Sequence, residues 1–251
     1  MKTLGAPIAI ERMLEGSCWE LCADVNGFAS PTSGELITQV AMGRSFQLID
    51  DLSKHSLDHD ESFRLEVRLL EDGYKCWLNL SEIMGQAFHR GTWKPRLLTN
   101  DQIHNRIPLV LNWIDKAASL KNQYLWGGTI GPDFDCSGLI QAAFASQQIW
   151  LPRDAYQQER FCETLQISFD NYSILRPGDL LFFGTHQKCK HVGIYIGSGS
   201  YYHSSGTSNG RNGIGYDALQ QIDKSSVAAY YRAQLRGAGR VVCCHDGVTL
   251  P

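Results

Sequence analysis

Apolar and polar side chains alternate strictly over residues 63–69, the stretch FRLEVRL. One side of an extended chain then carries only apolar residues, Phe63, Leu65, Val67 and Leu69. A period of two predicts a strand with one buried face. Asp72-Gly73 follows as a turn signal, and the shorter β-favourable runs LITQVA and SFQLI precede the strand. Several short strands separated by turn residues predict a small all-β barrel over residues 1–88.

The pattern becomes helical after a polar segment that contains Pro95, residues 89–106, which is predicted to be a linker. In PLVLNWIDKAASLKNQ, residues 108–123, apolar side chains recur at helical intervals. The glycine-rich loop YLWGGTIGPDFD follows and leads into CSGLIQAAFASQQ, whose apolar residues share one helix face. Two helices are therefore predicted on either side of this loop.

The rest of the chain is predicted to be rich in strands. LRPGDLLFFG joins a Pro-Gly-Asp turn to an apolar run, and HVGIYIGSGSYYHSSG has the pattern of a hairpin around a Gly-Ser-Gly tip. AAYYRAQLRG, residues 228–237, is predicted to be the final strand. We therefore expect a second, α+β domain with an antiparallel sheet over residues 107–238, and a tail over residues 239–251.

Composition narrows the function classes. The chain has 251 residues, of which 43% are hydrophobic and 20% charged, and a formal net charge of −3. This charge argues against a nucleic-acid partner, which requires a basic face. No apolar run approaches the ~20 residues that span a bilayer, so no membrane partner is predicted. The N-terminal MKTLGAPIAIERM lacks the long apolar core of a secretory signal, which predicts a cytoplasmic protein. The sequence leaves the oligomeric state open.

Eight cysteines are present: Cys18, Cys22, Cys76, Cys136, Cys162, Cys189, Cys243 and Cys244. A long chain without a secretory signal or dense cysteine spacing favours reduced thiols over disulfides. Any one of them could then be catalytic.

Cys136 has the most suggestive surroundings, because it stands between Asp135 and Ser137 where an apolar helix begins. Asp133 or Asp135 can cap that helix. A thiol in the first helical turn faces free N–H groups and the positive helix end, which lower its pKa and favour the nucleophilic thiolate. A small buried cysteine is the competing interpretation.

A cysteine nucleophile needs a histidine base, which in turn needs a polar partner to orient it. His191 opens one strand of the predicted hairpin, and His203 lies in the return strand. A two-residue tip puts these histidines on opposite faces. A three-residue tip puts them on one face, staggered by roughly 13 Å along the strand. A bulge or strong twist is therefore needed to bring them together.

Six segments stand in the order and spacing of the NlpC-type cell-wall cysteine peptidases: YLWGG, DCSGLI, LPRDAYQQ, LRPGDLLFF, HVGIYIG and YYHSSG. The resemblance covers about residues 105–236 and implies a papain-like α+β fold with a helix that bears the nucleophile. The N-terminal part, with DGYKCWL, resembles a bacterial SH3-like domain. The pairing is similar to the γ-D-glutamyl-L-diamino acid endopeptidases known from cyanobacteria.

This resemblance implies roles for individual residues. Cys136 is the nucleophile, His191 the general base and acid, and His203 the residue that orients His191. A further set is implied to bind the substrate or the oxyanion: Tyr124, Trp126, Asp135, Ser137, Tyr74, Arg153 and Asp154. Asp135 and Tyr74 are expected to bind a substrate ammonium, Arg153 or nearby donors the α-carboxylate of the glutamate, and Asp154 is expected to orient its loop. The alternatives are a surface aromatic role for Tyr74 and a local salt bridge between Arg153 and Asp154.

The implied substrate is a murein stem peptide, L-Ala-γ-D-Glu-diaminopimelate, with a free amino terminus. A thioester acyl-enzyme is the implied route, with neither cofactor nor metal. The sequence does not distinguish diaminopimelate from lysine, or peptide recycling from wall remodelling.

Other interpretations remain open. HQKCKH, residues 186–191, could bind zinc with His203, and CCHDG, residues 243–247, could bind a soft metal. A papain-like amidase or acyltransferase acting on another acyl substrate is a second alternative. A catalytically idle module that binds wall peptides is a third.

Overall fold

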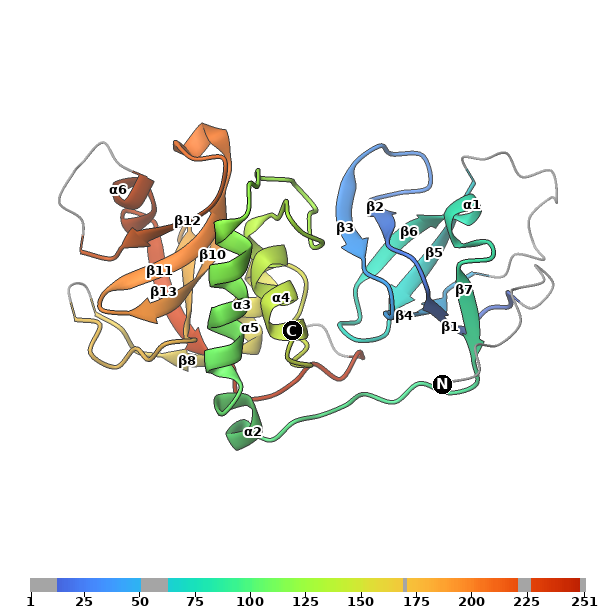
Figure 1. Ribbon diagram of the computed structural model, residues 1–251, viewed down its shortest axis with the longest axis horizontal. Helices are drawn as coiled ribbons and strands as arrows, with labels where there is room; N and C mark the ends of the chain where they lie inside the picture. Colours follow the sequence, from blue (N-terminus) through green and yellow to red (C-terminus); the bar gives the residue numbers. More distant parts are fainter. Residues whose placement is uncertain (1–12, 51–62, 169–170, 221–226, 249–251) are drawn as a thin grey trace. The chain divides into compact units, whose positions relative to one another are not determined.

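The computed structural model divides the chain into two compact units (Figure 1). The first consists of Met1–Pro95 with Asp246–Leu250, and the second is mainly Arg96–His245. The structure describes residues 13–50, 63–168, 171–220 and 227–248. Most of the N-terminal stretch that was compared with a secretory signal therefore lies outside the described residues. Within the described ranges, no helix is both long and apolar enough to cross a membrane.

The first unit is a seven-stranded antiparallel sheet with the order β3-β2-β6-β5-β4-β1-β7. Its strands are β1 (Cys18–Leu21), β2 (Val25–Phe28), β3 (Leu36–Val40), β4 (Ser45–Leu48), β5 (Arg64–Leu69), β6 (Lys75–Asn79) and β7 (Ala87–Arg90), with the short helix α1 (Leu80–Ile83). In β5, Leu65, Val67 and Leu69 are buried and the charged residues between them are partly exposed. The alternation in the sequence therefore identified this strand and its buried face.

The predicted linker, residues 89–106, is partly ordered structure. β7 continues to Arg90, paired with Cys18 of β1. Helix α2 (Asn100–His104) begins after Thr99, whose side chain accepts from the Gln102 N–H in a capping box. Because Thr99 and Gln102 stand three positions apart, this helix start could have been found in the sequence.

The second unit is a six-stranded antiparallel sheet with the order β12-β11-β10-β9-β13-β8. Its elements are α3 (Ile107–Ser119), α4 (Cys136–Ala145), α5 (Ala155–Phe161), β8 (Glu163–Leu165), β9 (Leu180–Gly184), β10 (Cys189–Gly197), β11 (Ser200–Ser205), the 3₁₀ turn η3 (Thr207–Asn209), β12 (Gly213–Ala218), α6 (Val227–Arg232) and β13 (Leu235–Arg240). The helices α3, α4 and α5 gather on one side of this sheet, and α6 lies away from them (Figure 1).

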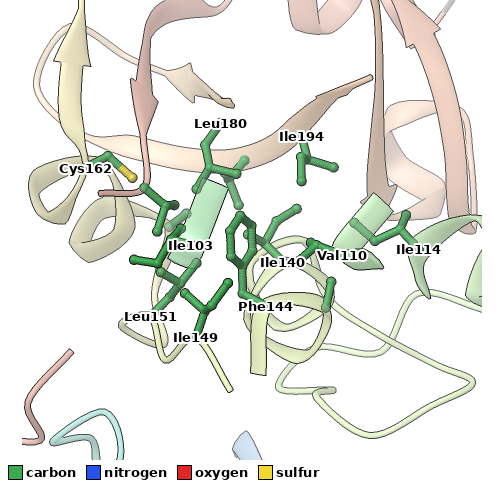
Figure 2. Packing of buried hydrophobic residues seen from close by; sticks show 14 of the residues in the cluster. Ile103, Val110, Ile114, Ile140, Phe144, Ile149, Leu151, Cys162, Leu180 and Ile194 are labelled. Atoms are coloured by element: carbon green, nitrogen blue, oxygen red, sulfur yellow. The ribbon is translucent and has the colours of Figure 1, made fainter. Parts of the chain in front are cut away.

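Helix α4 is the centre of the main hydrophobic core. Eight of its ten residues are buried, and Figure 2 shows Phe144 and Ile140 packed among Leu180, Ile149 and Leu151. Full burial of such a side chain stabilises the fold by about 1.5–3 kcal/mol. This packing fixes the helix, and with it the position of Cys136 at its first residue.

The final segment differs from the prediction. AAYYRAQLRG is not one strand: α6 covers its first half and β13 its second. Ala228 and Tyr231 are both buried, and their spacing of three places them on one helix face. The predicted tail is also ordered where it is described, since Cys244 and His245 are 7% and 3% exposed. The His245 N–H donates to the Trp150 carbonyl.

Candidate active site

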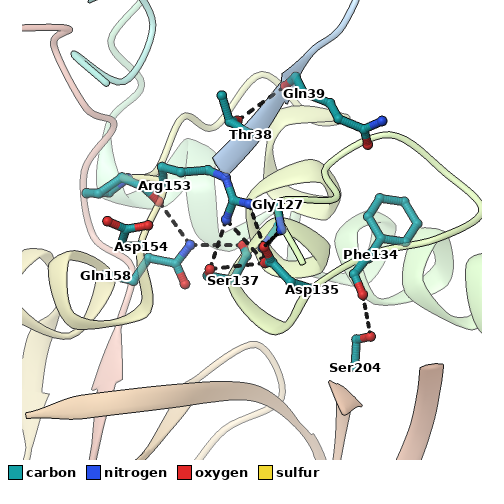
Figure 3. A network of polar contacts seen from close by, with 12 residues as sticks. Thr38, Gln39, Gly127, Phe134, Asp135, Ser137, Arg153, Asp154, Gln158 and Ser204 are labelled. Atoms are coloured by element: carbon teal, nitrogen blue, oxygen red, sulfur yellow. Dashed lines mark hydrogen bonds and ion pairs between the residues drawn. The ribbon is translucent and has the colours of Figure 1, made fainter. Parts of the chain in front are cut away.

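Cys136 is the first residue of α4, and it is 7% exposed. Asp135 is the N-cap, and its side chain accepts from the Gly138 N–H at 2.7 Å. The loop before the helix is tied to the sheet, because Ser204 Oγ on β11 donates to the Phe134 carbonyl at 2.6 Å (Figure 3). The sequence therefore folds the candidate nucleophile into a fixed helix start.

The Asp135 carboxylate lies in a buried polar network (Figure 3). Arg153 binds it through both oxygens, at 3.2 Å and 2.5 Å, and also donates to Ser137 Oγ at 3.0 Å. The Gly127 N–H and Ser137 Oγ donate to the same carboxylate. Because a carboxylate offers about four acceptor sites, these donors occupy Asp135 fully.

This network contains two residues with predicted substrate roles. Arg153 is 1% exposed and binds Asp135. Asp135 caps α4 and carries the charge opposite to Arg153. The substrate contacts expected of the two residues stay predictions. Ser137 Oγ serves the same network. Sequence spacing did not reveal the pair because the two residues come from different loops.

Asp154 is the N-cap of α5, where it forms a capping box with Gln157. The same helix contacts the start of α4, because Gln158 Nε2 donates to the Ser137 carbonyl at 3.1 Å. The capping position of Asp154 fits the expectation that it orients this loop, and a contact with substrate stays a prediction.

Substitution of Gly138 by alanine is expected to disturb this helix start. An added Cβ would lie 2.0 Å from the Gly128 carbonyl oxygen, a backbone atom that cannot move alone. The loss is expected to outweigh the roughly 0.5–1 kcal/mol that alanine adds inside a helix, giving net destabilisation of about 1–3 kcal/mol. Urea denaturation measures the change.

Gly237→Ala is the matched control, because nothing lies within 4 Å of an added Cβ there. Equal stability of the two variants would contradict the proposed close contact.

The two candidate histidines meet because the hairpin contains a bulge. The tip is two residues long, Ser198-Gly199, and both have positive φ. Gly197 pairs with Ser200 and Tyr195 with Tyr201, so the register shifts between Tyr195 and Gly197. The shift puts His191 and His203 on one face as diagonal neighbours across the two strands, about 7–8 Å apart and within reach of long side chains. The expected need for a bulge is confirmed.

His191 Nε2 lies 2.8 Å from His203 Nδ1. His203 Nε2 lies 2.7 Å from the carboxylate oxygen Oδ2 of Asp217 on β12. The two imidazoles are 8% and 0% exposed, so this row of hydrogen bonds is shielded from solvent. The contact between the two rings is one through which His203 could hold the orientation of His191; the role that the resemblance implies stays a prediction.

The sulfur of Cys136 contacts the strand that carries His191. It accepts hydrogen bonds from the N–H groups of Ser137 and Val192, and Val192 directly follows His191. Tyr231 is a second link: its ring stacks on His191 with centroids 4.1 Å apart. The pKa of its phenol is raised to about 12, first by burial, and the charge of Cys136 contributes to the rise.

The expected low pKa of the thiol is not found. The pKa of Cys136 is raised to about 12, chiefly by burial and then by the charge of Asp135, while the two N–H donors act in the opposite direction. The pKa of His191 is lowered well below its usual value, by burial and then by His203. Both shifts favour the uncharged forms, a thiol and a neutral imidazole.

Stability is expected to fall on acidification below pH ~6.5, the unfolded pKa of histidine. Burial lowers the folded pKa values of His191 and His203. Just below the unfolded pKa, the unfolded chain therefore binds protons that the native protein does not bind. For two such histidines the loss between pH 6.5 and 5.5 is on the order of 2 kcal/mol. Above pH 7 both histidines are neutral in the folded and in the unfolded protein, so their contribution to the pH dependence of stability vanishes.

Urea denaturation at pH 7.5 and 5.5 tests this dependence. His203→Gln should reduce it, and substitution of the exposed His186 by glutamine should leave it unchanged. The same dependence in all three proteins would show that other groups cause it.

The remaining predicted residues occupy varied positions. Tyr124 forms an isolated bridge with Phe134, and the pKa of its phenol is raised by burial and then by Cys136. Trp126 is 62% exposed. Tyr74 belongs to the first unit, where its N–H donates to Asp72 and its side chain packs against the barrel core.

No group of three or more metal-ligating side chains is arranged to hold an ion within the described part of the chain. In HQKCKH, His186 is exposed and Cys189 is buried, and Cys189 Sγ donates to the His191 carbonyl. The structure therefore does not support the zinc alternative.

Sequence reasoning missed Asp217 and Tyr231. Asp217 lies in no motif and reaches His203 only through the register of β11 with β12, where it pairs with Tyr201. Tyr231 fell within the segment that was predicted to be a strand. The spacing of three residues between Ala228 and Tyr231 was the signal in the sequence that indicated a helix.

Two parts of the chain match known protein families. Residues 121–236 match the NlpC/P60 family, and residues 27–83 match the bacterial dipeptidyl-peptidase SH3 domain. The first match spans the nucleophile, both histidines and Asp217. The second falls within the first unit.

Two curated relatives are similar to part of the chain. The "Bifunctional muramidase/DL-endopeptidase CwlT" of Bacillus subtilis is 39% identical over 123 residues, 47% of this chain and 32% of that protein. The "Murein DD-endopeptidase MepS/Murein LD-carboxypeptidase" of Escherichia coli is 35% identical over 116 residues, 45% of this chain and 55% of that protein. The aligned regions thus cover from about a third to just over half of these relatives' lengths.

Among solved structures, an NlpC/P60 family protein from Bacillus cereus aligns with 91% of this chain and 64% of its own, at 21% identity and a TM-score of 0.41.

Proposed function

We propose that this chain, whose second unit carries an NlpC/P60 domain and whose first carries a bacterial SH3 domain, is a cysteine peptidase of murein. Its proposed reaction is hydrolysis of the bond between γ-D-glutamate and diaminopimelate in stem peptides with a free amino-terminal L-alanine. The observation that carries the proposal is the histidine pair, 2.8 Å apart, beside the Val192 N–H that contacts the Cys136 sulfur.

The proposed reaction begins with the neutral thiol. His191 accepts the proton of Cys136 as the sulfur attacks the γ-carbonyl carbon, since a thiol is weak without a base. The negative charge that develops on the carbonyl oxygen needs donors, and the Cys136 N–H at the helix start and the Tyr124 phenol are proposed for this role.

Collapse of the tetrahedral intermediate breaks the amide bond. His191 returns its proton to the departing amine of diaminopimelate, which leaves the L-Ala-γ-D-Glu portion as a thioester on Cys136. Water then attacks this thioester with His191 as base, and the sulfur recovers the proton.

The choice of bond rests on similarity. One relative is named a DL-endopeptidase, which supports hydrolysis next to D-glutamate. Another is named a DD-endopeptidase and LD-carboxypeptidase, so a test has to include the corresponding bonds. The preference for a free amino terminus rests on the resemblance to the γ-D-glutamyl-L-diamino acid endopeptidases.

Three synthetic substrates separate the possibilities: the free tripeptide L-Ala-γ-D-Glu-diaminopimelate, its N-acetyl form, and a DD-cross-linked stem dimer. The proposal expects release of diaminopimelate from the free tripeptide only, identified by mass. Equal rates on the free and acetylated peptides would overturn the amine preference, and cleavage confined to the dimer would overturn the choice of bond.

A further inference from the structure

We propose that Asp217 is a positioning residue that fixes the proton arrangement of both histidines, and thereby makes Nδ1 of His191 the atom that accepts the Cys136 proton. The inference rests on the proposed function. Its physical basis is the continuous row of hydrogen bonds from His191 through His203 to Asp217.

The proton positions follow from donor and acceptor chemistry. An ionised carboxylate only accepts hydrogen bonds, so His203 Nε2, 2.7 Å from Asp217 Oδ2, must carry a proton. Neutral His203 then has a bare Nδ1, which accepts from His191 Nε2 at 2.8 Å. His191 therefore carries its proton on Nε2, and its Nδ1 has a lone pair.

Arg211 places a compensating positive charge beside Asp217. Its Nη2 lies 2.8 Å from the second carboxylate oxygen, Oδ1, so His203 and Arg211 bind different oxygens. Gly215 provides the room, because an added Cβ there would lie 1.8 Å from Arg211 Nη1. The absence of a side chain at Gly215 on β12 thus leaves space for the guanidinium that reaches Asp217.

The groups around His203 favour its neutral form. Burial lowers its pKa, while Asp217 acts in the opposite direction. The groups that face it from the packed elements are His191 on β10, Tyr201 on β11, Tyr231 on α6, Asp217 on β12 and Arg211 before β12. Asp217 is the one anion among these described neighbours, so it sets the direction of the hydrogen bonds.

Asp217→Asn tests this role. An amide can donate as well as accept, so a neutral amide at position 217 permits the reverse proton order, with His191 Nδ1 protonated and unable to accept from the thiol. The expected loss in kcat/KM is about 10²–10⁴-fold, up to the loss of about 10⁴ that follows when an aspartate in direct contact with a catalytic histidine becomes an amide. The loss should fall on kcat, with KM little changed.

Asp115→Asn is the matched control. Asp115 also holds a β11 side chain, since it accepts from the Tyr202 hydroxyl at 3.0 Å, but it lies outside the histidine row. The activity of the Asp115→Asn variant is expected to remain within about twofold of wild type, because surface changes of this kind have small effects.

The proton positions are measured directly by NMR of ¹⁵N-histidine-labelled protein at pH 7.5, with signals assigned through His191→Gln and His203→Gln. The expected wild-type spectrum has protonated Nε2 and bare Nδ1 at both histidines, and Asp217→Asn should populate the other tautomer. A wild-type His191 protonated on Nδ1 overturns the proposal, even where Asp217→Asn fails to fold. So does Asp217→Asn with unchanged kcat.

This spectrum needs no substrate. Failure of the proposed hydrolysis therefore leaves the proton arrangement testable, and the two failures are distinguishable.

Discussion

Cys136→Ala is expected to abolish hydrolysis of the stem peptide, with kcat reduced by about 10⁴–10⁶-fold. Loss of the nucleophile removes the covalent route altogether, and in a thiol or hydroxyl hydrolase the remaining groups recover little of it. Stability should change little, since the sulfur is small and α4 is held by its other buried residues. The measurement is release of diaminopimelate, with circular dichroism as the test of folding.

Cys162→Ala is the control, because Cys162 has the same 7% exposure in the same unit. It lies at the end of α5, and its pKa is raised by burial, but it has no part in the histidine row. Full activity is expected. Comparable losses in the two variants would mean that packing, and not sulfur chemistry, explains the effect.

Arg153→Met is expected to cause the largest loss of stability, about 3–5 kcal/mol. Removing one member of a buried ion pair leaves the other charge uncompensated in a medium of low polarity. Arg153 is 1% exposed and binds both oxygens of Asp135. The variant should also lose activity, because Asp135, left without its cation, sits next to Cys136. Urea denaturation followed by circular dichroism measures the change.

Arg236→Met provides the comparison. Its ion pair with Glu159 has 24% of each side chain exposed, and pairs of this kind contribute about 0.2–1 kcal/mol. A loss of similar size in both variants would contradict the structural importance given to the buried pair.

The sequence predicted the elements whose signals are local. The strict alternation in residues 63–69 identified β5, and the turn at Asp135 before an apolar run identified the start of α4. The motifs around His191 and His203 pointed to the two histidines. Their meeting required a bulge at the hairpin tip, and the structure contains it.

What the sequence missed depends on partners brought together from separate segments. Nothing in the chain showed that Arg153 would bind Asp135, because the two residues lie in different loops. Asp217 lies opposite Tyr201 only through strand pairing. The pKa of Cys136 was expected to fall at a helix start, whereas burial raises it. Desolvation depends on the whole surrounding core, which no short motif describes.

The central claim is that the Cys136 sulfur becomes acylated by the stem peptide. Rapid acid quenching of wild-type protein with the free tripeptide, followed by intact-mass and peptide-mapping spectrometry, tests it directly. We predict a mass increase equal to one L-Ala-γ-D-Glu acyl group, confined to the peptide containing Cys136 and absent in Cys136→Ala. Product release with the adduct on another cysteine, or hydrolysis that persists in Cys136→Ala, would contradict the account.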